Sequence, residues 1–299
     1  MKKGSTFTAY ILISVAIFFW GLSLIWTDMV IDMQVPVFVF TFLRMCIAGV
    51  VMLIASGISG KLQKIQKGDL KWFILMVFSE PFLYFIGESF GLKYTGSPTL
   101  VATIIATIPV FVMILGYIFF KENLSLTNRA GVLITLTGVI MFVLLGGEPL
   151  HADYFYGLAI IMVAILGSCG YSLICKKLTS KYTPFTITTY QFVFAIPFFT
   201  VTFLIWGLPE WKPEFLSFQV LRPILYLAVL CSCLCFGLYS NAIDKIGMTK
   251  SSIFTAIIPI VSAVFAYFMG RDSFTTLQLA GMAITLVGVV LSQYKPLQR

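Results

Sequence analysis

The sequence predicts an all-α integral membrane protein with ten transmembrane helices, built as two inverted repeats of five. Three observations lead to this prediction: an apolar composition, ten apolar stretches of spanning length, and a similarity between the two halves of the chain. Of the 299 residues, 59% are hydrophobic and 11% are charged. Soluble domains carry about 25% charged residues because their surfaces face water, and disordered chains carry little apolar surface. Lipid must therefore solvate much of this chain.

Ten stretches of the chain have the length and apolar character of a membrane span, which takes about 20 residues. Barrel strands would instead alternate polar and apolar residues in segments of about ten. The first stretch follows Met1-Lys2-Lys3 as a signal peptide would, but it is too long and lacks a small-x-small cleavage site, so we interpret it as a retained helix. The predicted spans are 7–26, 36–56, 72–92, 98–120, 130–146, 156–175, 185–206, 223–243, 251–269 and 277–294.

The basic residues lie mostly on one side of the predicted membrane. With the N-terminus inside, 15 of the 20 Lys and Arg fall on the inner side, four fall on the outer side, and Arg44 lies within a span. Cytoplasmic loops collect Lys and Arg, so we expect both termini to be cytoplasmic. The net charge of +8 is then a topology signal and not an indication of nucleic-acid binding.

The chain repeats itself at an offset of about 150 residues. Between 106–141 and 256–291, eleven of 36 aligned positions are identical. Generic hydrophobicity would produce Leu, Ile and Val matches, but these matches include proline, tyrosine and glycine pairs. We therefore predict two domains of five spans each, 1–150 and 151–299. Because five is odd, the second domain starts on the opposite side of the membrane, and such inverted repeats are typical of transporters.

Four features of this pattern recur in a known family. They are the two five-span halves, Trp20-Gly21 in the first span, Arg44 in the second span, and a small-residue fourth span with Pro109 or Pro259. Together they resemble the drug/metabolite transporter superfamily, most closely its EamA-like branch, and the resemblance covers essentially the whole chain. It implies a cell inner-membrane carrier, often an exporter of amino acids or other small metabolites, commonly without ATP.

Three ionisable side chains fall within the predicted spans, where a charge costs at least about 2.5–3.5 kcal/mol. Arg44 is in the second span, while Glu80 and Glu88 share one face of the third span with Tyr84 between them. One interpretation is a structural ion pair between spans two and three. In the other, Arg44 binds a substrate carboxylate and Glu80 carries a proton, its charge state balanced between burial and a nearby arginine. Tyr84 and Glu88 are further candidates for substrate binding or coupling, and the alternative for Glu88 is a place at the lipid–water boundary, near Lys93.

Repeat symmetry adds uncharged candidates for the same cavity. Gln191 aligns with Arg44 and Tyr239 with Glu88, so we expect these residues to face one another across it, with Asn241 nearby. Such polar groups also occur simply as hydrogen bonds between helices. Trp20 lies deeper than an interfacial tryptophan, and a buried indole N–H needs a partner. It is either packed core or a wall of the cavity.

Prolines and glycines predict bends and close contacts. Pro81 follows Glu80 inside a helix and removes one backbone hydrogen bond, which gives either a static kink or a bend toward a cavity. Pro109 and Pro259 occupy equivalent points of the fourth spans, where we expect hinges. In spans five and ten, glycines recur seven residues apart, which predicts packing of these two spans on each other, with a dimer contact as the alternative.

Several kinds of site are not expected. The six cysteines lie in apolar runs without Cys-x-x-Cys spacing and His151 is the one histidine, so we expect neither a metal site nor a cofactor. No phosphate-binding loop motif occurs. We expect a secondary-active or facilitative transporter of small molecules, with or without proton coupling, embedded in lipid as a monomer or homodimer. The alternatives are a channel or structural subunit and, less favoured, an integral-membrane enzyme.

Overall fold

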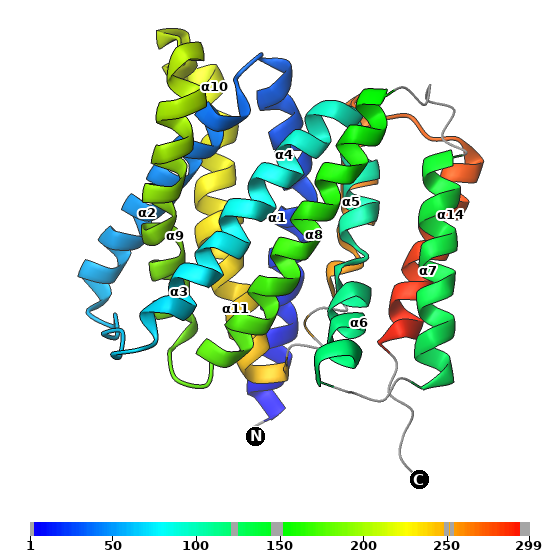
Figure 1. The fold of residues 1–299 in the computed structure, drawn as a ribbon, viewed down its shortest axis with the longest axis horizontal. Helices are drawn as coiled ribbons and strands as arrows, with labels where there is room; N and C mark the ends of the chain where they lie inside the picture. Colours follow the sequence, from blue (N-terminus) through cyan, green and yellow to red (C-terminus); the bar gives the residue numbers. More distant parts are fainter. Residues whose placement is uncertain (1–2, 121–124, 145–151, 248–250, 252–253, 294–299) are drawn as a thin grey trace.

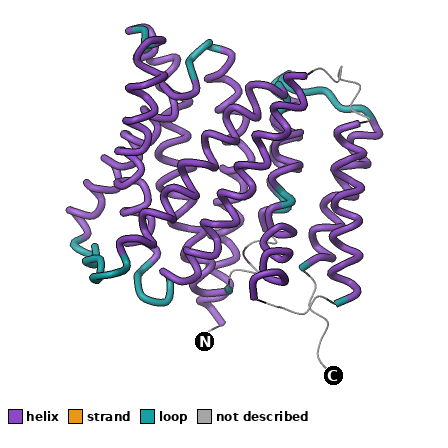
Figure 2. Tube along the Cα trace, viewed as in Figure 1, coloured by secondary structure: helices purple, strands orange, loops and turns teal. Residues whose placement is uncertain are grey.

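The computed structural model describes residues 3–120, 125–144, 152–247, 251 and 254–293, which form a bundle of helices running between two ends (Figure 1, Figure 2). Eight of these helices are long and apolar enough to cross a membrane, and two shorter apolar helices correspond to the ninth and tenth predicted spans. The predicted all-α membrane fold is confirmed. The helices α1 and α14 respectively begin and end at the same end of the bundle (Figure 1). His151 and the predicted span residues 145–146, 252–253 and 294 lie outside the described residues.

The helices follow the predicted spans, but the first continues to Asp32 and three others contain π-helical segments, labelled η1, η2 and η5. The elements are α1 (Lys3–Asp32), α2 (Val37–Ser59), α3 (Leu70–Val77), η1 (Phe78–Leu83), α4 (Tyr84–Thr95), α5 (Pro98–Ile105), α6 (Ile108–Phe120), α7 (Leu126–Leu144), α8 (Ala152–Leu178), α9 (Pro184–Thr202), η2 (Phe203–Gly207), η3 (Leu208–Glu210), η4 (Pro213–Leu216), α10 (Phe218–Leu225), η5 (Tyr226–Leu234), α11 (Cys235–Ile246), α13 (Ile258–Phe268) and α14 (Thr276–Ser292).

Helices of the two halves pack in pairs that follow the repeat. The second, fourth and fifth spans pack on their own counterparts, as α2 with α9, α5 with α13 and α7 with α14. The first span packs on the eighth (α1 with α11), and the third packs on the sixth (α4 with α8). These last two pairings are equivalent under the repeat. The arrangement is that of two inverted five-helix halves.

The contact between α7 and α14 depends on glycine. A Cβ atom added at Gly288 would lie 2.3 Å from the Thr135 backbone nitrogen, and one added at Gly131 would lie 2.3 Å from the Ser292 nitrogen. Only residues without side chains allow two helix backbones to approach so closely. The predicted packing of spans five and ten within one chain is confirmed.

Both fourth spans are broken just before their proline. A turn at Ala106 and Thr107 separates α5 from α6, which restarts at Ile108, and α13 likewise begins one residue before Pro259. Pro109 and Pro259 therefore lie in the first turn of a helix, where the missing N–H is not needed. The backbone change precedes each proline and is symmetric between the halves.

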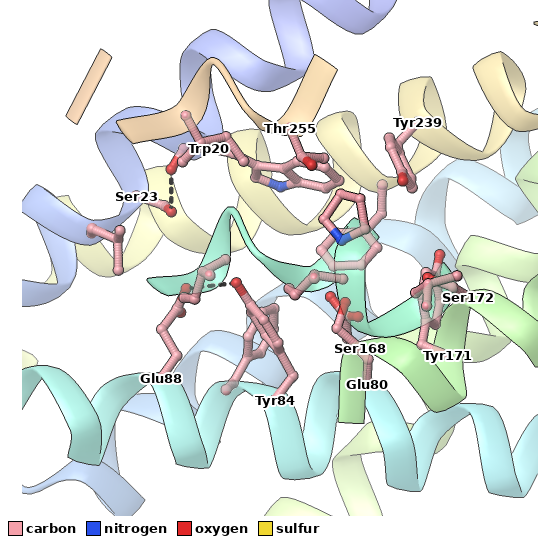
Figure 3. A pocket seen from close by; sticks show the side chains of 18 of the residues that line it. Trp20, Ser23, Glu80, Tyr84, Glu88, Ser168, Tyr171, Ser172, Tyr239 and Thr255 are labelled. Carbon is pink, nitrogen blue, oxygen red and sulfur yellow. Dashed lines mark hydrogen bonds between the residues drawn. The ribbon is translucent and has the colours of Figure 1, made fainter. Parts of the chain in front are cut away.

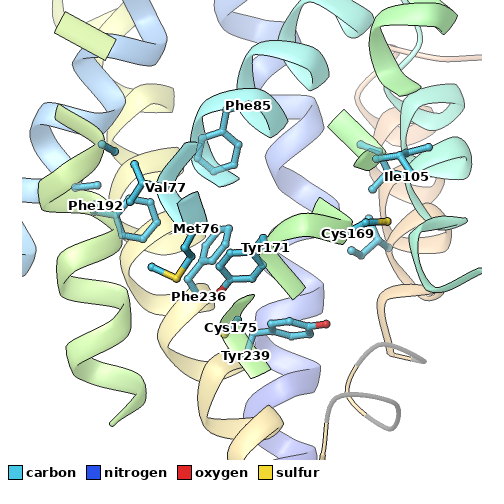
Figure 4. Packing of buried hydrophobic residues seen from close by; sticks show 14 of the residues in the cluster. Met76, Val77, Phe85, Ile105, Cys169, Tyr171, Cys175, Phe192, Phe236 and Tyr239 are labelled. Carbon is cyan, nitrogen blue, oxygen red and sulfur yellow. The ribbon is translucent and has the colours of Figure 1, made fainter. Parts of the chain in front are cut away.

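Aromatic side chains pack around Phe236 at the centre of the molecule (Figure 4). The ring centroid of Phe236 lies 5.5 Å from Phe192, 5.9 Å from Tyr171 and 6.1 Å from Phe85, all in edge-on arrangements. Edge-on contacts are a favourable geometry for aromatic pairs. Since these rings come from α4, α8, α9 and α11, the cluster joins both halves.

Candidate functional site

A cavity lies between the two halves and is lined by residues of both (Figure 3). In Figure 3, Glu80, Tyr84 and Glu88 rise from one interrupted helix, and Trp20 and Thr255 lie on the opposite wall. Its lining is mostly apolar and aromatic with a few polar groups, as in many small-molecule sites. The lining residues are Trp20, Ser23, Leu24, Arg44, Glu80, Tyr84, Phe85, Glu88, Ile105, Ile108, Pro109, Val112, Ser168, Tyr171, Ser172, Phe236, Tyr239, Thr255 and Ile258.

Arg44 supplies the positive charge of the cavity. The residue is 2% exposed, its Nε donates a hydrogen bond to Ser232 Oγ at 3.1 Å, and its guanidinium carbon lies 3.7 Å from the centre of the Phe85 ring. The described residues include neither a hydrogen-bond acceptor for its Nη1 atom nor a salt bridge to it. In place of the alternative ion pair between spans two and three, Arg44 is held by η5 of the other half. The Nη1 group therefore remains available to a ligand.

Glu80 supplies a carboxylate at the break in the third span. Its backbone angles, φ −150° and ψ 118°, are extended and interrupt the helix, and the bond to Pro81 is cis. The side chain is 6% exposed, the Ser168 hydroxyl lies against it, and Oε2 has no hydrogen-bond partner within the described chain. The sequence placed the bend at Pro81, whereas the extended residue is Glu80 itself. This conformation turns the carboxylate into the cavity (Figure 3).

Glu88 lies in the cavity and not at the lipid–water boundary. It is 4% exposed and accepts a hydrogen bond from the Tyr84 hydroxyl at 3.0 Å. The boundary prediction was wrong because α4 continues to Thr95, past the expected end of the span. In addition, the face of α4 that carries Tyr84 and Glu88 turns inward. Arg44 lines the same cavity, and its positive charge interacts with this carboxylate.

Trp20 forms a wall of the cavity, which decides between the two alternatives left by the sequence. Its indole Nε1 donates to the Cys231 carbonyl at 3.0 Å. Its ring lies 5.2 Å from Phe236 and 5.1 Å from Tyr239 between centroids. The indole N–H is thus paired with the π-helical segment η5, and the ring face is left beside the cavity.

The remaining predicted residues divide into two groups. Tyr239 lines the cavity, whereas Gln191 and Asn241 are not part of its lining. Gln191 is fully buried and its Nε2 donates to the Glu80 backbone carbonyl at 3.2 Å. It therefore contacts the backbone of a cavity residue without lining the cavity itself. Asn241 is half-buried, and its Oδ1 has no hydrogen-bond partner in the described chain.

Sequence reasoning missed several lining residues. Ser168 and Tyr171 on α8 gave no signal, because isolated hydroxyl residues are common in membrane helices. Ser172 carried one, because it aligns with Ser23 at the offset of 149 residues, and both line the cavity. Phe85 and Phe236 did carry one: they align at the offset of 151 residues that aligns Gly96 with Gly247. A comparison of aromatic positions between the halves would have found this pair.

A mostly apolar cavity with a few charged groups, shared by two inverted five-helix halves, is the architecture of a membrane transporter. The chain belongs to the EamA-like transporter family, whose model matches residues 7–144 and 155–294. It is a membrane-embedded transporter and not an enzyme.

Known proteins of similar sequence carry transporter names. The uncharacterized transporter YetK of Bacillus subtilis (strain 168) is 26% identical over 97% of this chain and 88% of its own length. The probable terminal-alkyne amino-acid exporter of Streptantibioticus cattleyicolor is 24% identical over 86% of this chain and 84% of its own length. One crystal structure superposes with a TM-score of 0.70 at 16% identity, covering 95% of this chain and 96% of that chain, which shows a shared fold.

Proposed function

We propose that this protein exports small metabolites such as amino acids, as a secondary-active or facilitative transporter working by alternating access. Its two halves, 1–150 and 151–299, would open the central cavity in turn to each side of a cell inner membrane, with both termini in the cytoplasm. The single observation that carries the proposal is a buried, incompletely bonded Arg44 and Glu80 in one cavity between inverted halves. Buried charges without full pairing are costly, so their retention is best explained by a ligand that pairs with them.

The charges indicate the chemistry of the substrate. Arg44 Nη1 offers a hydrogen-bond donor to an anionic group such as a carboxylate. Glu80 Oε2 offers an acceptor to an ammonium group or a proton. The rings of Trp20, Phe85 and Phe236 line the space around these groups and suit an apolar body. An amino acid with an apolar side chain combines all three features, and the name of the Streptantibioticus relative agrees with that class.

Coupling is proposed to involve Glu80. A carboxyl group buried in this way can gain and lose a proton as its surroundings change between conformations. Exchange of that proton against the substrate ammonium at Oε2 would link the two fluxes. Glu88 is already hydrogen-bonded by Tyr84 and faces Arg44, so it is better placed to balance the arginine than to move a proton.

The experiment is flux in proteoliposomes with purified protein. Vesicles loaded with one amino acid at a time are tested for uptake of labelled amino acids, with and without a pH gradient. A carrier gives saturable uptake that is accelerated by internal substrate, whereas a channel gives uptake that rises linearly. Thermal stabilisation by the same compounds reports binding separately, because a ligand stabilises the state to which it binds.

A further inference from the structure

The loop between α13 and α14 is tied to the end of α1 by an arginine. Arg271 Nη1 donates to Asp28 Oδ2 at 3.1 Å and also to Asp32 Oδ2. The two aspartates are four residues apart and therefore lie on one face of the last turns of α1. One guanidinium group thus joins two carboxylates, and Asp28 is itself buried.

The next residue ties the same loop to a third segment. Asp272 Oδ2 accepts a hydrogen bond from Ser97 Oγ at 2.7 Å and from the Thr99 backbone nitrogen at 3.3 Å. Ser97 is the N-cap of α5 and lies on the connection from α4. Arg271 and Asp272 together join the end of α1, the α4–α5 connection and the α13–α14 loop.

These joined segments surround one end of the cavity. Ser23 lines the cavity on α1, and Asp28 follows it by five residues, or about 7.5 Å along the helix. Glu88 on α4, Ile105 on α5 and Ile258 on α13 also line the cavity. Every helix that Arg271 and Asp272 tie together is therefore a wall of the cavity. A path from the cavity to this end of the molecule can therefore run between the tied helices.

The opposite end of the molecule has different chemistry at the equivalent positions. At the repeat offset of 149 residues, Asp28 and Asp32 align with Lys177 and Lys181. Lys181 forms a salt bridge with Asp69, and Lys177 lies 3.6 Å from the centre of the Trp72 ring. Both lysines thus join α8 to the start of the third span. Within the described part of the chain, the three-segment tie occurs at the Arg271 end.

We propose that Arg271 and Asp272 form an ionic latch that closes the cavity at the α13–α14 end of the molecule, and that opening to this side requires the Arg271 bonds to break. The proposal rests on the alternating access proposed above. It adds a specific device that holds one of the two states, and it explains why two carboxylates at the end of α1 share one arginine.

Cysteine accessibility tests the latch without knowledge of the substrate. In a variant with all six native cysteines replaced, Ser23→Cys places a thiol in the cavity, and a membrane-impermeant maleimide is applied from either side of sealed vesicles. Lys212→Cys, made separately, marks the side: it is exposed and precedes α10, at the same end of the bundle as the α13–α14 loop (Figure 1). Labelling rates are then compared between the intact latch, Arg271→Gln and the control Arg222→Gln, an exposed arginine at that end.

The expected result is labelling of Ser23→Cys that accelerates about tenfold in Arg271→Gln from the Lys212 side alone, because two charge-assisted hydrogen bonds are lost. Arg271→Lys, which keeps one charged donor group, should label at an intermediate rate, and Arg222→Gln should change nothing. Asp272→Asn, made separately, should weaken the tie to Ser97 and raise the rate less.

Three results would overturn the latch. They are an unchanged labelling rate in a folded Arg271→Gln protein, an equal rise from both sides, and an equal rise in Arg222→Gln. Gel filtration and the thermal transition of each variant establish that it is folded. The latch can fail while wild-type vesicles still show saturable counterflow. Conversely, absence of any flux with an intact labelling result would reject the proposed function and leave the latch standing.

Discussion

The third spans of the two halves, α3–η1–α4 and α10–η5–α11, are alike in position but differ in backbone and chemistry: η1 contains an extended residue, Glu80, whereas η5 is π-helical from Tyr226 to Leu234. Both contain a π-helical segment, and the offset of 151 residues that aligns Phe85 with Phe236 also aligns Glu80 with Cys231. Each segment accepts a hydrogen bond from the second span of the other half: Arg44 binds Ser232, and Gln191 binds the Glu80 carbonyl. π-Helical turns inside helices are frequent at functional sites.

The comparison of these two segments distinguishes a structural feature that both have from charged groups that only one has. The shared part, a π-helical segment in one half that accepts a hydrogen bond from the other half, maintains the inverted architecture. The unshared part is charge: the first half contributes Arg44, Glu80 and Glu88 to the cavity, where the second has Gln191, Cys231 and Tyr239. All three charged side chains of the site therefore come from one half, while the second half orients Arg44 and the Glu80 backbone. Changes at charged positions should alter transport, and changes at the orienting positions should mainly alter stability.

The largest effect is expected at Glu80. Glu80→Gln keeps the size and the extended backbone but removes the negative charge and the titratable proton. We expect transport driven by a pH gradient to fall to background while the protein remains folded, measured as labelled substrate uptake in proteoliposomes at several external pH values.

The matched control for that variant is Glu214→Gln, an exposed carboxylate in η4 outside the cavity. It should transport like the wild type. Normal pH-dependent uptake by Glu80→Gln would remove Glu80 from the coupling mechanism and would break the proposed division between charged and orienting positions.

Arg44→Gln tests the other charged position by giving the first half the residue that the second half has. Hydrogen bonds to charged groups contribute about 1.5–3 kcal/mol, so loss of the Nη1 donor should weaken binding of a carboxylate-bearing substrate about 10- to 100-fold. Thermal-shift titration with an amino acid and with its decarboxylated amine measures this. If both compounds lose affinity equally, Arg44 supports the fold of the site and does not read the carboxylate.

Much of the fold and part of the site could be predicted from the sequence, for a physical reason. Charges in an apolar stretch are costly, so Arg44 and Glu80 stood out, and the repeated proline and glycine pairs indicated the inverted halves. Uncharged cavity residues such as Ser168 and Tyr171 did not stand out, because the same residues occur on helix contacts and at lipid. Glu88 was misplaced because depth was counted from an assumed helix end, and only packing shows which face turns inward.

The hydrogen bonds from Arg44 to Ser232 and from Gln191 to the Glu80 carbonyl should contribute unequally to stability. Ser232→Ala leaves the Nε of a buried arginine without a partner, which costs about 1–3 kcal/mol. Gln191→Leu removes the Nε2 donor together with an Oε1 atom that already lacks a partner in the described chain, so the loss should be smaller, about 1 kcal/mol or less. Unfolding of both variants in mixed micelles gives the comparison. A larger loss of stability for Gln191→Leu would mean that η1 depends more on the hydrogen bond from Gln191 than η5 depends on the hydrogen bond from Arg44.

Substitution of the glycines beside η1 and η5 by alanine should also have different effects on stability. A Cβ atom at Gly167 on α8 would lie 2.6 Å from the Ser79 carbonyl oxygen in η1, whereas one at Gly237, just after η5, would meet nothing within 4 Å. Gly167→Ala should therefore destabilise by about 1–3 kcal/mol through overpacking. Gly237→Ala should be neutral or stabilise by up to about 1 kcal/mol, because alanine favours helix. The same unfolding assay applies. Equal effects of the two substitutions would show that η1 shifts to accommodate the added methyl group at Gly167 without loss of stability.

The smallest effect is expected at the starts of the two third spans. Asp69, just before α3, accepts hydrogen bonds from Lys181 and Tyr182, and these bonds lower the pKa of its carboxyl. Neither Asp69 nor Ser217, at the corresponding start of α10, makes a side-chain capping bond to its own helix, so the Asp69 contacts act between segments. Because the folded-state pKa is depressed, the stabilisation by Asp69 is present above its ordinary pKa of about 4 and is lost as the pH falls through the lowered value. Asp69→Asn should be slightly less stable than the wild type at pH 7, with the difference shrinking below about pH 4, as thermal unfolding across pH would show. A difference in stability that stays constant down to the lowest pH tested would mean that the Asp69 contacts act through shape and not through charge. The charge of Asp69 would then not count among the differences between the two third spans.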